Sequence, residues 1–173
     1  MILVTVGTHH QGFNRLVQAM DDVAASLNEH VVIQRGSSSY EPQHAEHFKF
    51  TTSKNIERLT QQARIVVAHA AAGSALVTLL NQKPLIVVPR LQQFGEHIDD
   101  HQPQLANALD GEHKAVAVLE PSLHTLQAAI ERVTKQPTEN RGATQLVHAL
   151  RRHVTEWSTP KRRGLLHLFP FAR

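Results

Sequence analysis

The sequence contains no cysteine among its 173 residues. Disulfides and thiolate chemistry are therefore excluded, and the composition is compatible with a reducing compartment. Aromatic residues are also scarce, at 5% of the chain, and no zinc-finger spacing, helix-turn-helix or basic-aromatic motif indicates nucleic-acid binding. The apolar N-terminus lacks the basic region of a signal peptide and is too short to span a membrane, so we expect residues 2–6 to form a core strand.

Charge is distributed unevenly along the chain. The net charge is +3, yet residues 141–173 hold seven Lys or Arg and one acid, whereas residues 1–140 hold 11 bases and 14 acids. We expect one domain over residues 1–157, because 41% hydrophobic content supplies a core. Residues 158–173 form a basic and apolar tail, which either folds back over the domain or docks onto a partner or a membrane surface.

Strand-like and helix-like segments alternate along the domain, which is typical of an α/β layer protein with a mostly parallel sheet. We predict a Rossmann-like sheet with helices on both faces. The predicted strands lie at residues 2–6, 31–33, 48–51, 65–68, 84–89 and 115–119. The predicted helices lie at residues 13–27, 55–63, from 73 onward, 102–109, 121–133 and 142–157.

Residues 65–102 are the most informative stretch of the chain. A buried apolar strand ends in His69, passes through small residues, and continues as a helix from about Gly73. Small residues at such a turn allow a ligand to approach the backbone, and unpaired N–H groups at a helix start favour an anion. The N–H groups of Gly73, Ser74 and Ala75 are therefore candidates to bind a diphosphate.

Two further loops are expected at the same edge, because ligands of open parallel sheets bind at the carboxyl ends of the strands. The loop at residues 7–12 follows the first strand, and its N–H groups and the Thr8 hydroxyl are candidates to hold phosphate oxygens. It lacks the Lys and the spacing of a P-loop. The loop at residues 95–102 is almost wholly polar, which suits contacts to sugar hydroxyls.

Several motifs in this order resemble the C-terminal domain of glycosyltransferase family 28. They are VTVGTH at 4–9, followed by Phe13 and Arg15, HAAAGS at 69–74, KPLIVVPR at 83–90 and GEHIDDHQ at 95–102. The resemblance covers residues 1–135 and implies the C-terminal half of a GT-B glycosyltransferase. Within the family, the chain resembles the small donor-binding subunit of two-component transferases. These include bacterial exopolysaccharide enzymes and the eukaryotic UDP-N-acetylglucosamine transferase of dolichol-linked oligosaccharide synthesis.

The resemblance implies inverting transfer from a UDP-sugar without a metal or other cofactor. A separate membrane-associated subunit would bind a lipid-linked acceptor, supply the catalytic base and hold this cytoplasmic chain peripherally at the inner face of the membrane. His69 and His97 are further candidate contacts to the nucleoside or sugar, although His69 is equally well explained as a buried strand-end residue. The positions matching the diphosphate site are Gly7, Thr8, Gly73 and Ser74, and those matching the sugar loop are Glu96, His101 and Gln102.

Two residues depart from the family pattern. Ala71 stands where Gly is more usual, and Val77 stands where several relatives have an acid that binds the ribose hydroxyls, which makes Thr78 a candidate substitute. His97 and His101 stand four residues apart and would share a helix face, which raises a metal site as an alternative. The spacing is not H-E-x-x-H, and we expect no metal.

Two other functions remain open from the sequence. One is a non-catalytic subunit that binds a nucleotide sugar or only stabilises its partner. The other is a standalone domain that binds a metal or phosphate. The sequence also leaves open whether the sugar is glucuronic acid, galactose or N-acetylglucosamine.

Overall fold

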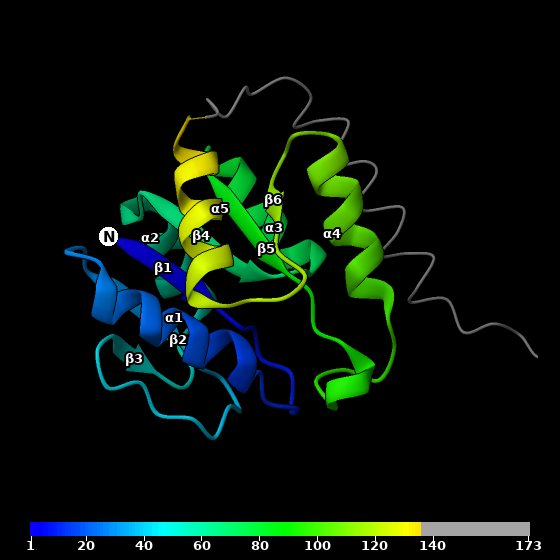
Figure 1. Cartoon of the computed structure of the whole chain (residues 1–173), viewed down its shortest axis with the longest axis horizontal. Coiled ribbons are helices and arrows are strands. Elements are labelled where there is room, and N and C mark those ends of the chain that lie inside the picture. The colour runs from blue at the N-terminus through cyan, green and yellow to red at the C-terminus, as the bar shows by residue number, and fades with distance from the viewer. Residues whose placement is uncertain (136–173) are drawn as a thin grey trace, which may run out of the picture.

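Six parallel strands form the centre of the computed structural model, which describes residues 1–135 (Figure 1). The predicted helix at 142–157 and the tail at 158–173 lie outside the described residues. The strands are β1 (Ile2–Thr5), β2 (Val31–Gln34), β3 (Glu46–Phe48), β4 (Ile65–His69), β5 (Leu85–Val88) and β6 (Val116–Ala117).

The order of the strands determines where a ligand can bind. The order is β3-β2-β1-β4-β5-β6, and every pair is parallel. The chain builds outward from β1 in one direction and then returns to build outward from β4 in the other. In such sheets, the loops that follow the two central strands diverge and leave a crevice at the carboxyl edge. The loops after Thr5 and His69 flank this switch point.

Helices cover both faces of the sheet, as predicted (Figure 1). The alternation of side chains along each strand explains this arrangement: in β1, Ile2 and Val4 belong to one apolar cluster and Leu3 belongs to the other. The first cluster is covered by α1 (Asn14–Ser26) and α5 (Leu123–Lys135). The second is covered by α2 (Ser53–Gln62), α3 (Ala72–Leu80) and α4 (His101–Gly111). None of the helices within residues 1–135 is long and apolar enough to cross a membrane.

The boundaries of the outer elements differ from the prediction. The strand expected at 48–51 is β3 at Glu46–Phe48, and β6 is shorter than the predicted 115–119. Both are edge strands with one neighbour, and the side chains of Glu46 and His47 are exposed. An edge strand needs no apolar alternation, so the hydrophobic pattern does not locate it.

Candidate functional site

The N-terminus of α3 presents backbone N–H groups at the carboxyl edge of the sheet. Ala71 precedes the helix in an extended conformation and provides no side-chain cap. By helix geometry, the N–H groups of Ala72, Gly73 and Ser74 have no acceptor within the helix. The N–H of Ala75 donates to the carbonyl of Ala71 at 3.0 Å. The prediction that Ala75 offers an open donor is therefore wrong. Three N–H groups and the positive end of the helix dipole are thus available at this end of α3.

Gly7 brings the first loop onto the side chain of His69. Its φ of +76° lies in the left-handed region, and a Cβ at this position would lie 2.6 Å from two atoms of the His69 ring. Gln34 fixes the same turn, because its Nε2 donates to the carbonyl of Gly7 at 3.2 Å, and its Oε1 accepts from the Thr5 hydroxyl. Glycine is therefore required here for both backbone conformation and space.

His69 is a buried, neutral platform beneath the crevice. Burial, together with the positive charge of Arg90, lowers the pKa of His69 to about 4, so the ring is uncharged at pH 7. Its Nδ1 lies 3.4 Å from both the carbonyl of Thr5 and the hydroxyl of Ser74. The ring supports Gly7 and Ser74 through packing and polar contact rather than through charge.

Two cavities lie on either side of the α3 N-terminus, and both are lined by Ala71 and Gly73. The first has a volume of about 320 Å³ and combines the small residues before α3 with polar side chains of the 95–102 loop. The second has a volume of about 400 Å³ and reaches from β1 to α2. The polar residues of the first are His97, Asp99, His101 and Gln102. The second includes Thr8, Thr51, Ser53, Ile56, Ser74, Val77 and Thr78.

Asp99 links the two histidines of the polar loop. Its Oδ1 lies 2.9 Å from His97 Nδ1, and its Oδ2 lies 3.8 Å from His101 Nε2. The expected common helix face is wrong, because α4 begins at His101 and His97 lies in the loop before it. Within residues 1–135, no group of three or more acidic or histidine side chains is arranged to hold a metal ion.

A stack of imidazole rings joins the loop after β1 to the loop before α4. The ring centroids of His9 and His97 lie 4.9 Å apart, and those of His9 and His10 lie 4.4 Å apart. Burial lowers the pKa of His9, and the neighbouring His10 and His97 lower it further. The loop after β1 and the loop before α4 are therefore in direct contact.

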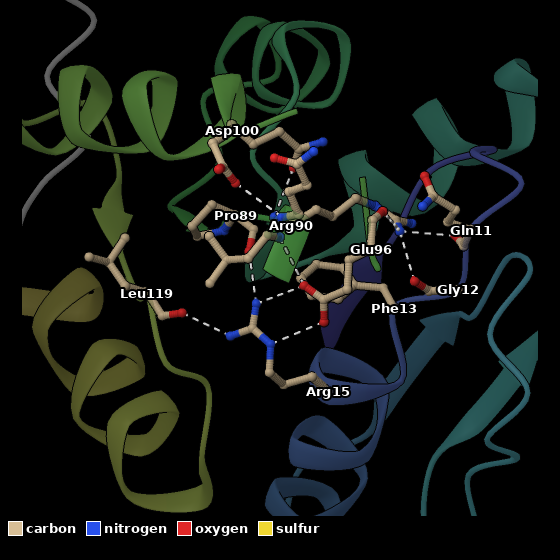
Figure 2. Close-up of polar contacts among 12 residues, drawn as sticks. Gln11, Gly12, Phe13, Arg15, Pro89, Arg90, Glu96, Asp100 and Leu119 are labelled. Carbon is tan, nitrogen blue, oxygen red and sulfur yellow. Dashed lines mark hydrogen bonds and ion pairs between the residues drawn. The ribbon is translucent and has the colours of Figure 1, made fainter. Parts of the chain in front are cut away.

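Glu96 is engaged within the protein rather than directed into either cavity. Its carboxylate accepts two hydrogen bonds from Arg15, at 2.9 and 3.1 Å, and one from the N–H of Leu91 at 3.0 Å (Figure 2). The side chain of Gln102 lines the smaller cavity, and its Oε1 accepts from the N–H of Arg90 at 3.1 Å. Of the polar loop, His97, His101 and Gln102 face the cavity, whereas Glu96 organises the loop.

Val77 replaces an acid that binds ribose in several relatives, and the structure shows which neighbouring side chains could take its place. Val77 lines the larger cavity, as does Thr78, but the Thr78 hydroxyl donates to the carbonyl of Ser74 at 2.8 Å. Thr51, just before α2, and Ser53, the first residue of α2, also line this cavity. Polar groups for a ligand are thus supplied from a helix that the sequence motifs did not include.

Arg90, the second residue after β5, has no role predicted from the sequence. Arg90 is 1% exposed, and its guanidinium donates to four backbone carbonyls that belong to the loops around the crevice. The signal in the sequence was an arginine one residue beyond an apolar strand, within the motif KPLIVVPR. Hydrogen bonds to backbone carbonyls depend on the fold and leave no pattern of their own in the sequence.

The fold and the crevice define a class of protein: a Rossmann-like domain equivalent to the C-terminal half of a GT-B glycosyltransferase. Similar solved structures support this class. The glycotransferase of kitacinnamycin superposes with a TM-score of 0.65 at 22% identity, covering 92% of this chain and 43% of that one. The calicheamicin glycosyltransferase CalG4 gives a TM-score of 0.59 at 15% identity, with 89% and 38% covered. MurG of Acinetobacter baumannii gives 0.57 at 14% identity, with 90% and 48% covered.

The family model of the glycosyltransferase family 28 C-terminal domain matches residues 1–155. The chain belongs to this family. A search of curated proteins found no match. The chain spans less than half the length of each of the three solved structures.

Proposed function

We propose that the chain is the donor-binding subunit of an inverting, UDP-sugar-dependent glycosyltransferase. It would act with a membrane-associated partner on a lipid-linked acceptor in polysaccharide biosynthesis. The observation that carries this proposal is the uncapped N-terminus of α3 between two cavities. A nucleotide sugar has the matching form, because a diphosphate separates two larger groups. Membership of the glycosyltransferase family supports the same class of ligand.

Each part of the donor has a proposed place. The diphosphate binds the N–H groups of Gly73 and Ser74, with Gly7 and Thr8 on the opposite side. The nucleoside occupies the larger cavity, where Ile56 offers an apolar surface and the start of α2 offers hydroxyls. The sugar occupies the smaller cavity, because His97, His101 and Gln102 supply donors and acceptors for its hydroxyls.

The proposed chemistry is stabilisation of the leaving group. As the bond from the anomeric carbon to the diphosphate oxygen breaks, negative charge grows on the departing UDP. Fixed N–H donors at that point stabilise the transition state more than the ground state. A single preorganised donor of this kind contributes about 3 kcal/mol in other enzymes. His69 adds no charge, since burial holds its pKa at about 4. No metal or cofactor takes part in the proposed step.

The acceptor half is assigned to a separate polypeptide. This assignment rests on the resemblance of the sequence motifs to the small donor-binding subunit of two-component transferases. A base that deprotonates the attacking hydroxyl is needed on the opposite face of the sugar. We place that base, the lipid-linked acceptor site and the attachment to the membrane on the partner.

The experiment that tests the proposal is a calorimetric titration with UDP and a panel of UDP-sugars. Ser74→Trp places an indole at the proposed phosphate site, and Leu80→Trp places the same group on an exposed position at the far end of α3. We expect saturable binding by the unmodified chain and by Leu80→Trp, and none by Ser74→Trp. Equal binding by both variants would refute the site. Absence of binding, with and without a co-expressed partner, would favour the partner-stabilising alternative.

A further inference from the structure

The side chain of Arg90 lies at the centre of the carboxyl edge. Its Nη1 donates to the carbonyls of Gln11, Gly12 and Glu96 at 3.0 Å each, and its Nη2 donates to the carbonyl of Val6 at 2.7 Å (Figure 2). The guanidinium also packs over the ring of Phe13, 4.9 Å from its centroid. One buried cation therefore contacts two segments, residues 6–12 and residue 96, that are far apart in the sequence.

These two segments carry the loops that border the crevice. Val6, Gln11 and Gly12 bracket the loop that contains Gly7 and Thr8, and Glu96 begins the loop that contains His97. The main chain of Arg90 reaches a third point, because its N–H donates to Oε1 of Gln102 at 3.1 Å. Of the residues proposed to contact diphosphate and sugar, Gly7 and His97 thus directly follow a residue whose carbonyl Arg90 contacts, and Gln102 bonds to Arg90 itself. Gly73 and Ser74, on α3, are held independently of it.

A second arginine strengthens the same connection. Arg15, on the first turn of α1, holds the carboxylate of Glu96 with two hydrogen bonds and donates to the carbonyls of Pro89 and Leu119 (Figure 2). The loops that follow β1, β5 and β6 are therefore joined through two guanidinium groups. The stacked rings of His9 and His97 lie where the first two of these loops meet.

We propose that Arg90 is a positioning residue of the donor site, which holds the loops 7–12 and 95–102 in one arrangement so that the diphosphate and sugar contacts are correctly spaced. This inference rests on the proposed function. Arg90 lines neither cavity, and neither do the four residues whose carbonyls it contacts. It acts through their chain neighbours Gly7 and His97, which line the larger and the smaller cavity.

Arginine is suited to this task in a way that lysine is not. The guanidinium is planar and offers five N–H donors in fixed directions, whereas an ammonium offers three donors at a single point. Four carbonyls from two separate segments surround this side chain, and only the wider set of donors of a guanidinium can reach all of them. Arg90→Lys keeps the positive charge but leaves part of this set without a donor.

The test compares Arg90→Lys with Arg64→Lys. Arg64 precedes β4 at the opposite end of the strands, where it pairs with Glu29, so the control removes an arginine–carboxylate contact far from the crevice. Both variants are studied at a temperature at which thermal unfolding curves show them folded. The imidazole resonances of His9 and His97, assigned with His9→Gln and His97→Gln, report the relative position of the loops without ligand. Calorimetry with UDP reports the site.

We expect Arg90→Lys to shift both imidazole resonances and to raise the Kd for UDP roughly tenfold or more, since small misplacements of positioning groups have effects of this size. Arg64→Lys should change neither. A folded Arg90→Lys chain with unchanged resonances and unchanged Kd would overturn the inference. If Arg90→Lys does not fold, Arg15→Lys tests the same connection, because the Arg15 side chain is 20% exposed and its replacement is milder. The readouts are then the His97 imidazole resonance and the Kd for UDP.

The two proposals fail in different ways. If the unmodified chain binds no UDP, the proposed function fails and the claim of a donor-positioning role falls with it. The imidazole resonances then still show whether Arg90 sets the arrangement of the loops. If the unmodified chain binds UDP and Arg90→Lys binds equally well, the proposed function stands and the role of Arg90 is refuted.

Discussion

Gly7 and Gly73 lie at the same proposed diphosphate site but should respond to alanine in opposite ways. Gly7 has a φ of +76°, and an added Cβ would lie 2.6 Å from the His69 ring. The left-handed conformation costs a non-glycine residue about 1–2 kcal/mol, and overpacking a buried contact adds about 1–3 kcal/mol. Gly7→Ala should therefore lower the free energy of unfolding by about 2–5 kcal/mol.

Gly73 is the matched control. It lies in the first turn of α3, and an added Cβ would meet no atom within 4 Å. Alanine at a compatible position restricts the unfolded chain, so Gly73→Ala should be neutral or stabilising by up to about 1 kcal/mol. Urea denaturation of both variants at pH 7 measures the two effects. Equal stability of Gly7→Ala and the unmodified chain, or a loss in Gly73→Ala as large as that in Gly7→Ala, would refute this account of the turn.

Three further predictions concern charge and pH. Burial alone would raise the pKa of Asp21, but hydrogen bonds from the N–H groups of Gln43 and His44 and from the Tyr40 hydroxyl lower it on balance. Asp21→Asn should cost about 2–3 kcal/mol by urea denaturation, and a loss under about 0.5 kcal/mol would contradict the hydrogen-bond account. His69 has a folded pKa of about 4 against an ordinary 6.5, so the unfolded chain binds the proton first and stability falls as pH drops from 6.5 to 4. Between pH 7 and 5, protonation of this group should lower the free energy of unfolding by about 2 kcal/mol. His69→Gln should lack this loss, and the same pH dependence of stability in the variant and the unmodified chain would refute the assignment. Glu96→Gln should lower stability by about 2–4 kcal/mol, because it leaves the partly buried Arg15 without its carboxylate; if thermal unfolding is unchanged, the pair does not organise the loop.

The sheet and the position of the crevice follow from local patterns in the sequence. Apolar runs such as Ile65–His69 alternate with helical spacing, and this pattern is sufficient for a parallel sheet covered on both faces. The small residues before α3 predict a turn and a helix start, and the structure confirms both. The helix begins at Ala72, one residue before the predicted Gly73. These features depend on residues close together in the chain.

The internal organisation of the site depends on long-range contacts and was not predictable in this way. Glu96 and Arg15 are 81 residues apart, so nothing in the polar loop itself indicates that the carboxylate is engaged. Arg90 bonds to backbone carbonyls, which every residue has. The expected helical pairing of His97 with His101 failed because α4 starts only at His101. Spacing predicts a shared face only when both residues lie inside the helix.

We propose that the N-terminus of α3 binds the diphosphate of a nucleotide donor. The most direct test is a titration of the ¹⁵N-labelled chain with UDP, followed by the amide resonances. We expect saturable shifts that are largest at Ala72, Gly73 and Ser74, with smaller shifts around both cavities. The Ser74→Trp variant should show no shifts of this size. Saturable shifts centred elsewhere, with the amides of α3 unmoved, would contradict the proposal.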